Sequence, residues 1–161
     1  MLCDCHLQRE QNQIMDNEAK EILHNIMRNS EVQKMKQYIQ HGKVSTYEHC
    51  KNVAKLSLHI DRRLSLHSDL KVLLTGAMLH DFYLYDWHES DGGSHRLHGF
   101  THPRTACRNA RRVFDIDEGT ARVITTHMWP LNLTPLPRSR EEWIVCIADK
   151  SVSLYETLFR R

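Results

Sequence analysis

A histidine and an aspartate stand side by side in the segment A-M-L-H-D-F, residues 77–82, directly after an apolar run. The run includes Leu73, Leu74 and Met78, so the pair follows residues of a kind that form a core. Burying an unpaired charge costs free energy, and ionisable residues rarely follow such a run without compensation. His80 and Asp81 therefore need a partner that the neighbouring residues do not supply.

Other histidines and aspartates of the chain also fall on apolar faces of predicted helices. His49, for example, precedes Val53 by four residues and Ile60 by eleven, which places all three on one face of a helix. The further residues on apolar faces are His102, His127 and Asp149. A single inward histidine is most often a hydrogen-bonded core residue, and a buried aspartate is most often paired with Arg or Lys. Five helices that each carry such a residue favour one shared cause: a metal site, because a cation compensates carboxylates and binds imidazole nitrogen.

Helical periodicity predicts the elements that must position these residues. We expect an all-α bundle of about six to eight helices over residues 16–161, with a polar lead-in over 1–15 and no convincing strand pair. The predicted helices span residues 17–29, 31–40, 46–64, 69–82, 101–114, 118–128 and 140–158. Their predicted N-caps, where one is indicated, are Ser45 or Thr46, Ser68, Thr101, Asp117 and Ser139. Loops are expected over 84–100 and 129–138, and the 69–82 helix should be central because apolar residues surround its axis.

Composition excludes several classes of function. The formal net charge is +2, and no block of Lys and Arg marks a nucleic-acid surface. No apolar run is long enough to cross a bilayer, and the first residues lack the apolar segment of a secretory signal. The five cysteines form no C-x-x-C pair, which favours reduced thiols and a cytoplasmic location.

The ordered set His49 … His80-Asp81 … Asp149 resembles the HD-domain superfamily of metal-dependent phosphohydrolases, whose pattern is H…HD…D on an all-α bundle. The resemblance covers the chain from about Thr46 to Tyr155. The segment T-H-P-R-T-A, residues 101–106, also looks like the H-P segment that supplies a second-metal ligand in dinuclear members. His127 lies where such members carry a further ligand.

The resemblance implies a dinuclear centre and a hydrolytic reaction. One metal would be held by His49, His80, Asp81 and Asp149, and the second by Asp81, His102 and His127, with Asp81 bridging. Such a pair holds a bridging hydroxide as the nucleophile and clamps a phosphate, so the expected substrate is a phosphate ester or phosphoanhydride, in a nucleotide or a dinucleoside polyphosphate. Imidazole-rich donors suit Fe, Mn, Co, Ni or Zn better than Mg or Ca, and the resemblance favours iron or manganese.

The sequence departs from some members of the superfamily. Members that cleave cyclic di-GMP carry G-Y-P after the last histidine, whereas this chain reads H-M-W-P-L-N, and the lysine that many place after H-D is replaced by F-Y-L-Y-D-W. By ligand set the chain is more similar to small bacterial HD hydrolases that split symmetrical dinucleoside tetraphosphates. The alternatives are a mononuclear nucleotide phosphohydrolase, with His102 and His127 binding phosphate, and a non-catalytic sensor of metal or nucleotide.

Several residues near the expected metals are candidates for substrate contact. Arg104 follows His102 and is either a phosphate clamp or a solvated charge, and Lys150 follows Asp149. Trp129 either stacks on a nucleobase or closes the end of the bundle, and His98 is a candidate general acid. The remaining histidines, including His41, are expected to be exposed, and a homodimer through the N-terminal helices is possible. The sequence thus predicts a reaction type, while the substrate depends on loops that carry no recognisable motif.

Overall fold

The computed structural model describes residues 16–86 and 98–160, with side chains described from Gly99 onward in the second range. Residues 16–27 are helical. The elements that follow are α2 (Ser30–Lys34), the 3-10 helix η1 (Met35–Gln37), β1 (Ile39–His41), β2 (Val44–Ser45), α3 (Thr46–Arg63), α4 (Leu70–Leu79), α5 (His98–Phe114), α6 (Glu118–Thr126) and α7 (Arg140–Phe159). The predicted all-α fold is confirmed. The predicted lead-in over residues 1–15 and most of the predicted loop lie outside the described residues.

The region before α3 differs from the sequence-based prediction. A helix was expected over 31–40, but α2 and η1 end by Gln37 and an antiparallel pair of short strands follows. Tyr38 and Ile39 favour extended backbone, and Gly42 adopts a φ of 58°, which permits the tight turn between the strands. The expectation of no strand pair was therefore wrong for this hairpin.

The helix starts follow local capping chemistry. Ser45, Asp117 and Ser139 cap α3, α6 and α7 as predicted, and Ser139 forms a reciprocal capping box with Glu142. Two predicted starts were wrong. Asp69 rather than Ser68 caps α4, because its carboxylate accepts hydrogen bonds from the backbone of residues 71 and 72. α5 begins at His98 rather than after Thr101, so Pro103 lies in its second turn instead of its first.

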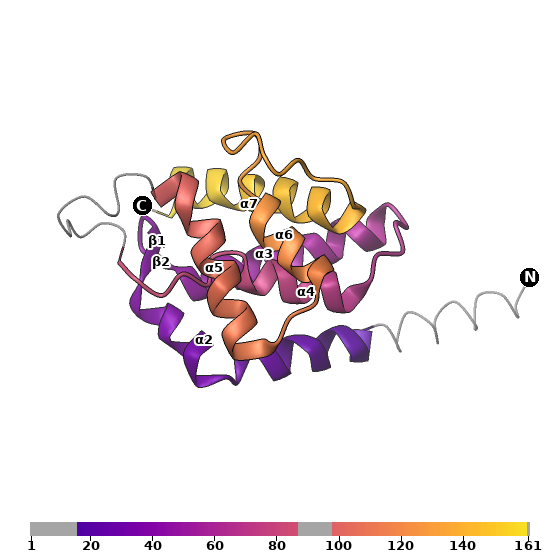
Figure 1. Ribbon diagram of the computed structural model, residues 1–161, viewed down its shortest axis with the longest axis horizontal. Helices are drawn as coiled ribbons and strands as arrows, with labels where there is room; N and C mark the ends of the chain where they lie inside the picture. Colours follow the sequence, from indigo (N-terminus) through magenta and orange to yellow (C-terminus); the bar gives the residue numbers. More distant parts are fainter. Residues whose placement is uncertain (1–15, 87–97, 161) are drawn as a thin grey trace, which may run out of the picture.

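α4 is the central helix of the bundle, as its composition predicted. It contacts α3, α5, α6 and α7, and its side chains Leu73, Leu74 and Met78 are fully buried. Figure 1 shows α5 and α6 in front of α3 and α4 in this view, with α7 along one side and the 16–27 helix along the other. A Cβ at Gly76 would overlap the side chain of Val123, so glycine permits the close approach of α4 and α6. This approach brings the end of α4 next to the end of α6.

Three cysteines in the described part of the chain, Cys50, Cys107 and Cys146, are buried free thiols. Among the residues that the structure describes, none of the helices has the combination of length and apolar character that a membrane span requires.

Candidate metal centre

Five helices bring six buried histidine and aspartate side chains to one place in the bundle. α3 contributes His49 and α5 contributes His102. His80 and Asp81 follow the last turn of α4, and His127 is the C-cap of α6. α7 contributes Asp149, and the exposed fraction of all six residues is 7% or less. The structure therefore places together all six residues that were predicted as metal ligands.

The first group of ligand atoms lies between α3, α4 and α7. Asp149 Oδ1 lies 3.2 Å from His49 Nε2 and 3.6 Å from His80 Nε2. Asp81 Oδ2 lies 3.3 Å from His80 Nε2 and 3.9 Å from His49 Nε2. His49, His80 and Asp81 form a group that could hold one transition-metal ion, and the Asp149 oxygen beside both imidazoles adds a second carboxylate.

The second group uses the other oxygen of the same aspartate. Asp81 Oδ1 lies 3.1 Å from His102 Nε2 and 3.6 Å from His127 Nε2. The Nε2 atoms of His102 and His127 are 3.0 Å apart. Asp81, His102 and His127 could hold a second ion, and Asp81 belongs to both groups with a different oxygen in each. This is the geometry expected of a bridging carboxylate.

The outer ring nitrogens of three histidines are held by hydrogen bonds. His80 Nδ1 donates to the carbonyl of Ala77 at 2.8 Å, and His127 Nδ1 donates to the carbonyl of Ile124 at 2.7 Å. His49 Nδ1 lies 2.8 Å from Glu156 Oε2. Each Nδ1 therefore has an acceptor for its proton, which leaves Nε2 as the atom of each ring that can bind a metal. All three rings are therefore oriented as metal ligands require.

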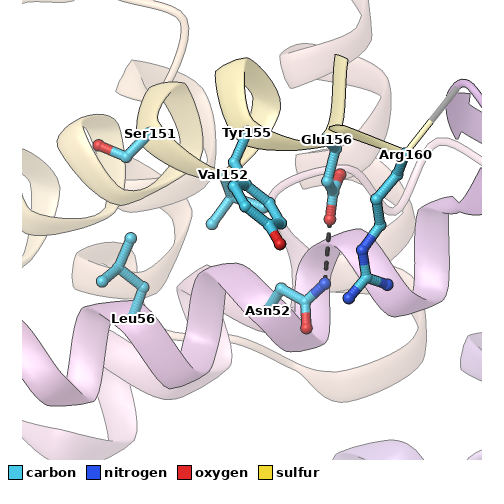
Figure 2. A pocket seen from close by; sticks show the side chains of 7 residues that line it. All are labelled: Asn52, Leu56, Ser151, Val152, Tyr155, Glu156 and Arg160. Carbon is cyan, nitrogen blue, oxygen red and sulfur yellow. Dashed lines mark hydrogen bonds between the residues drawn. The ribbon is translucent and has the colours of Figure 1, made fainter. Parts of the chain in front are cut away.

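Glu156 is a member of this site that the sequence analysis missed. Its side chain is 1% exposed, and its Oε1 accepts a hydrogen bond of 3.0 Å from Asn52 while Oε2 faces His49. Figure 2 shows Asn52 on α3 pointing toward Glu156 on α7, beside a pocket of about 250 Å³. Helical spacing could have revealed this pair from the sequence. Glu156 follows Asp149 by seven residues and Asn52 follows His49 by three, so each lies on the same helix face as a predicted ligand.

The β1–β2 hairpin brings two more residues that were not predicted. Gln40 Nε2 donates a hydrogen bond of 2.6 Å to Asp81 Oδ2. The ring of His41 meets the ring of His49 edge to face, with centroids 5.5 Å apart, and His41 is half-buried. The expectation that His41 is exposed was wrong, because residues 39–41 form a strand that contacts α3.

Electrostatics in the cluster are dominated by burial and by pairing between imidazoles and carboxylates. Burial raises the pKa of Asp81 and Asp149, but nearby histidines outweigh it and hold both well below the usual range. Burial lowers the pKa of His49, but hydrogen bonds to Asp149 and Glu156 raise it to about 10. For His127, burial and the neighbouring His80 lower the pKa to about 3. The imidazole of His127 is therefore neutral and available as a ligand.

Two buried atoms of the cluster have no hydrogen-bond partner among the described residues: His80 Nε2 and Asp81 Oδ1. A buried acceptor without a partner costs about 1–3 kcal/mol, so such atoms are rare without a specific reason. Each atom belongs to one of the two groups of ligand atoms, and a cation in each group would satisfy both. The residues present therefore fit a metal centre.

The residues predicted to contact substrate differ in their contacts and exposure. Lys150 Nζ donates a 2.7 Å hydrogen bond to the carbonyl of His127, so it holds the end of α6. Trp129 packs against Trp143 with ring centroids 5.0 Å apart, as expected if it closes the end of the bundle. Arg104 is exposed, and no ion pair is found for it within residues 16–86 and 98–160. The side chain of His98 lies outside the described part of the chain.

Comparison with known proteins identifies one family. The sequence model of the family described as HD domain matches residues 46–153, about two thirds of the chain. This span begins at α3, ends within α7 and includes all six clustered residues. Comparison with curated proteins and with solved structures gave no match.

Proposed function

This chain belongs to the HD domain family, whose members are generally metal-dependent phosphohydrolases, and from that premise we propose that it hydrolyses a phosphate ester or phosphoanhydride at a two-metal centre. One observation carries the proposal. The two oxygens of Asp81 face two different pairs of histidine nitrogens, at 3.1–3.9 Å. A single aspartate shared in this way supports two adjacent cations rather than one.

The proposed ligands divide between two ions. The first would be held by His49, His80, Asp149 and Asp81 Oδ2, and the second by His102, His127 and Asp81 Oδ1. Two such ions supply a water of lowered pKa as the nucleophile and a positively charged clamp for phosphate oxygens. Iron or manganese is proposed, and zinc, cobalt or nickel would also suit these donors.

The chain's own residues orient the centre and bind the substrate. The outer hydrogen bonds of His49, His80 and His127 fix the ring orientations, which saves reorganisation when the metals bind. Arg104 is exposed two residues after His102 and is proposed to contact a substrate phosphate. A general-acid role for His98 is part of the same proposal. The proposed substrate class is nucleotides and dinucleoside polyphosphates, on the resemblance in ligand set.

Substitution of the shared aspartate tests the proposal. Purified wild-type protein, loaded with Fe(II) or Mn(II), is assayed with p-nitrophenyl phosphate, bis-p-nitrophenyl phosphate, nucleotides and dinucleoside polyphosphates. Asp81→Ala should lose both metals and all turnover, because both groups share this side chain. Glu118→Ala, on the exposed start of α6, is the control and should match wild type. A fully active Asp81→Ala protein without metal would contradict the proposal.

A mononuclear centre is the second candidate, and one observation favours it. Asp149 adds a second carboxylate to the first group, whereas the second group contains only Asp81. The 3.0 Å contact between His102 and His127 can be a hydrogen bond without a metal. His102 and His127 would then bind substrate phosphate directly. A metal content of one ion per chain with turnover would support this candidate. Stoichiometric nucleotide binding without turnover would instead favour the sensor alternative.

A further inference from the structure

The hairpin before α3 contains a β-bulge at Gln40. Ile39 pairs with Ser45 and His41 pairs with Val44, so two steps along β1 match one step along β2. Gln40 is the extra residue. Neighbouring side chains of a regular strand point to opposite faces, whereas a bulge re-aims a side chain. Here the bulge lets Gln40 reach Asp81 while His41, the next residue, meets His49.

The amide of Gln40 is held at both ends. Gln40 is 8% exposed, and its Oε1 accepts hydrogen bonds from the hydroxyl of Tyr83 and, at 3.4 Å, from that of Thr46. The carboxylate of Asp81 can only accept hydrogen bonds, so the NH2 end of Gln40 must face it, and Oε1 must face the hydroxyls of Tyr83 and Thr46. The 2.6 Å contact from Nε2 to Asp81 Oδ2 is therefore a donated hydrogen bond of fixed direction.

This hydrogen bond makes the two oxygens of Asp81 unequal. Oδ2 is held on the side of His49 and His80, where Gln40 donates to it. Oδ1 has no hydrogen-bond partner among the described residues and faces His102 and His127. Rotation of the carboxylate would bring both oxygens toward one group, in the bidentate arrangement that serves a single ion.

We infer that Gln40 is a positioning residue of the metal centre, which holds Asp81 in the bridging orientation and thereby keeps the second metal site available. The inference rests on the proposed two-metal function. It gives the bulged hairpin a role in the centre, although the hairpin lies outside the span matched by the family, residues 46–153. It also gives a reason for the burial of Gln40, whose amide donates to the Asp81 carboxylate.

A purely structural role would have different consequences. If Gln40 only fills space and satisfies the hydroxyls of Tyr83 and Thr46, its replacement would lower stability without changing how many metals bind. If it positions Asp81, its replacement should weaken the second metal more than the first. The number of bound metals and the affinity of each therefore distinguish the two roles, and neither readout requires a known substrate.

The experiment compares Mn(II) binding to wild type, Gln40→Glu, Gln40→Ala and Ile39→Ala by calorimetric titration and elemental analysis. Gln40→Glu exchanges the donating NH2 for an oxygen that faces Asp81 Oδ2, and it should weaken the second metal by roughly 10- to 100-fold, the usual effect of an outer-shell partner. Gln40→Ala frees the carboxylate and should also favour loss of the second metal. Ile39→Ala, on an exposed position of the same strand, is the matched control and should bind as wild type.

The outcomes separate the inference from the proposed function. Two metals in wild type with a weakened second metal in both Gln40 variants would support the inference. Two metals of unchanged affinity in both Gln40 variants would overturn it and leave the proposed function intact. Wild type that binds no second metal would overturn both. Thermal melting of the metal-free proteins shows whether each variant is folded. If Gln40→Glu does not fold, the metal affinities of Gln40→Ala serve as the test.

Discussion

Replacing Glu156 with glutamine should weaken the first metal site without touching any proposed ligand. The carboxylate of Glu156 accepts the outer proton of His49, whereas His80 and His127 donate to backbone carbonyls. A negatively charged acceptor makes the imidazole a stronger metal ligand than a neutral one does. Glu156→Gln keeps the size of the side chain and an acceptor oxygen but removes the charge.

The size of the effect follows from the burial and length of this contact. Glu156 is 1% exposed and lies 2.8 Å from His49 Nδ1, so little solvent screens the interaction. Outer-shell partners of this kind contribute roughly 10- to 100-fold to metal affinity, which corresponds to about 1.4–2.7 kcal/mol. We expect an increase in this range in the Kd of the first, tighter Mn(II) ion, and a smaller change for the second ion.

Competition with a chelator measures this change. Metal-loaded wild type, Glu156→Gln and Asn52→Ala are titrated with a chelator of known affinity, and the metal retained is measured. Asn52→Ala is the control, because it removes the donor to Glu156 Oε1 and leaves the contact with His49 in place. Its effect should be the smaller of the two, since water from the adjacent pocket can replace the lost donor. Equal metal retention by Glu156→Gln and wild type would refute the reasoning.

Three further predictions follow from the same structure. The pKa of His49 is raised to about 10 in the metal-free protein, because its hydrogen bonds to Asp149 and Glu156 outweigh the effect of burial. Binding of the first metal should therefore release a proton, and metal affinity should increase with pH up to about 10. Calorimetry in buffers of different ionisation enthalpy measures that proton, and no release at about pH 8 would contradict the assignment. Gly76→Ala should lower stability by about 1–3 kcal/mol, because its Cβ overlaps Val123 and forces α4 away from α6, and a melting temperature equal to that of wild type would contradict this packing. Arg104→Ala should raise KM for a phosphorylated substrate without changing metal content or melting temperature, because the side chain is exposed, and an unchanged KM would remove it from the substrate site.

The six clustered residues could be found from sequence because local rules place them. Helical periodicity puts His49 on the same face as Val53, and His80-Asp81 follows a run that is buried in the structure on nearly every position. Capping residues then fix where α3, α6 and α7 begin. None of these arguments needs knowledge of which helices touch.

The supporting residues could not be found in the same way, because their burial depends on tertiary neighbours. Glu156 lies near the end of α7 among exposed residues, and its carboxylate is buried only because α3 brings His49 and Asn52 to it. Gln40 and His41 reach the cluster through a bulge in a two-stranded hairpin, which has no helical or alternating pattern. A helix predicted through residue 40 directed Gln40 elsewhere and left His41 just beyond its end.

Metal content of wild type and His102→Ala, purified without added metal or chelator, is the most direct test of the two-metal centre. His102 contacts Asp81 Oδ1 but belongs only to the second group of ligand atoms. Elemental analysis should find two ions per chain in wild type and one in the variant. One ion in both would assign His102 to the substrate and contradict the dinuclear centre, and no ion in either would remove the physical basis of the proposed hydrolase.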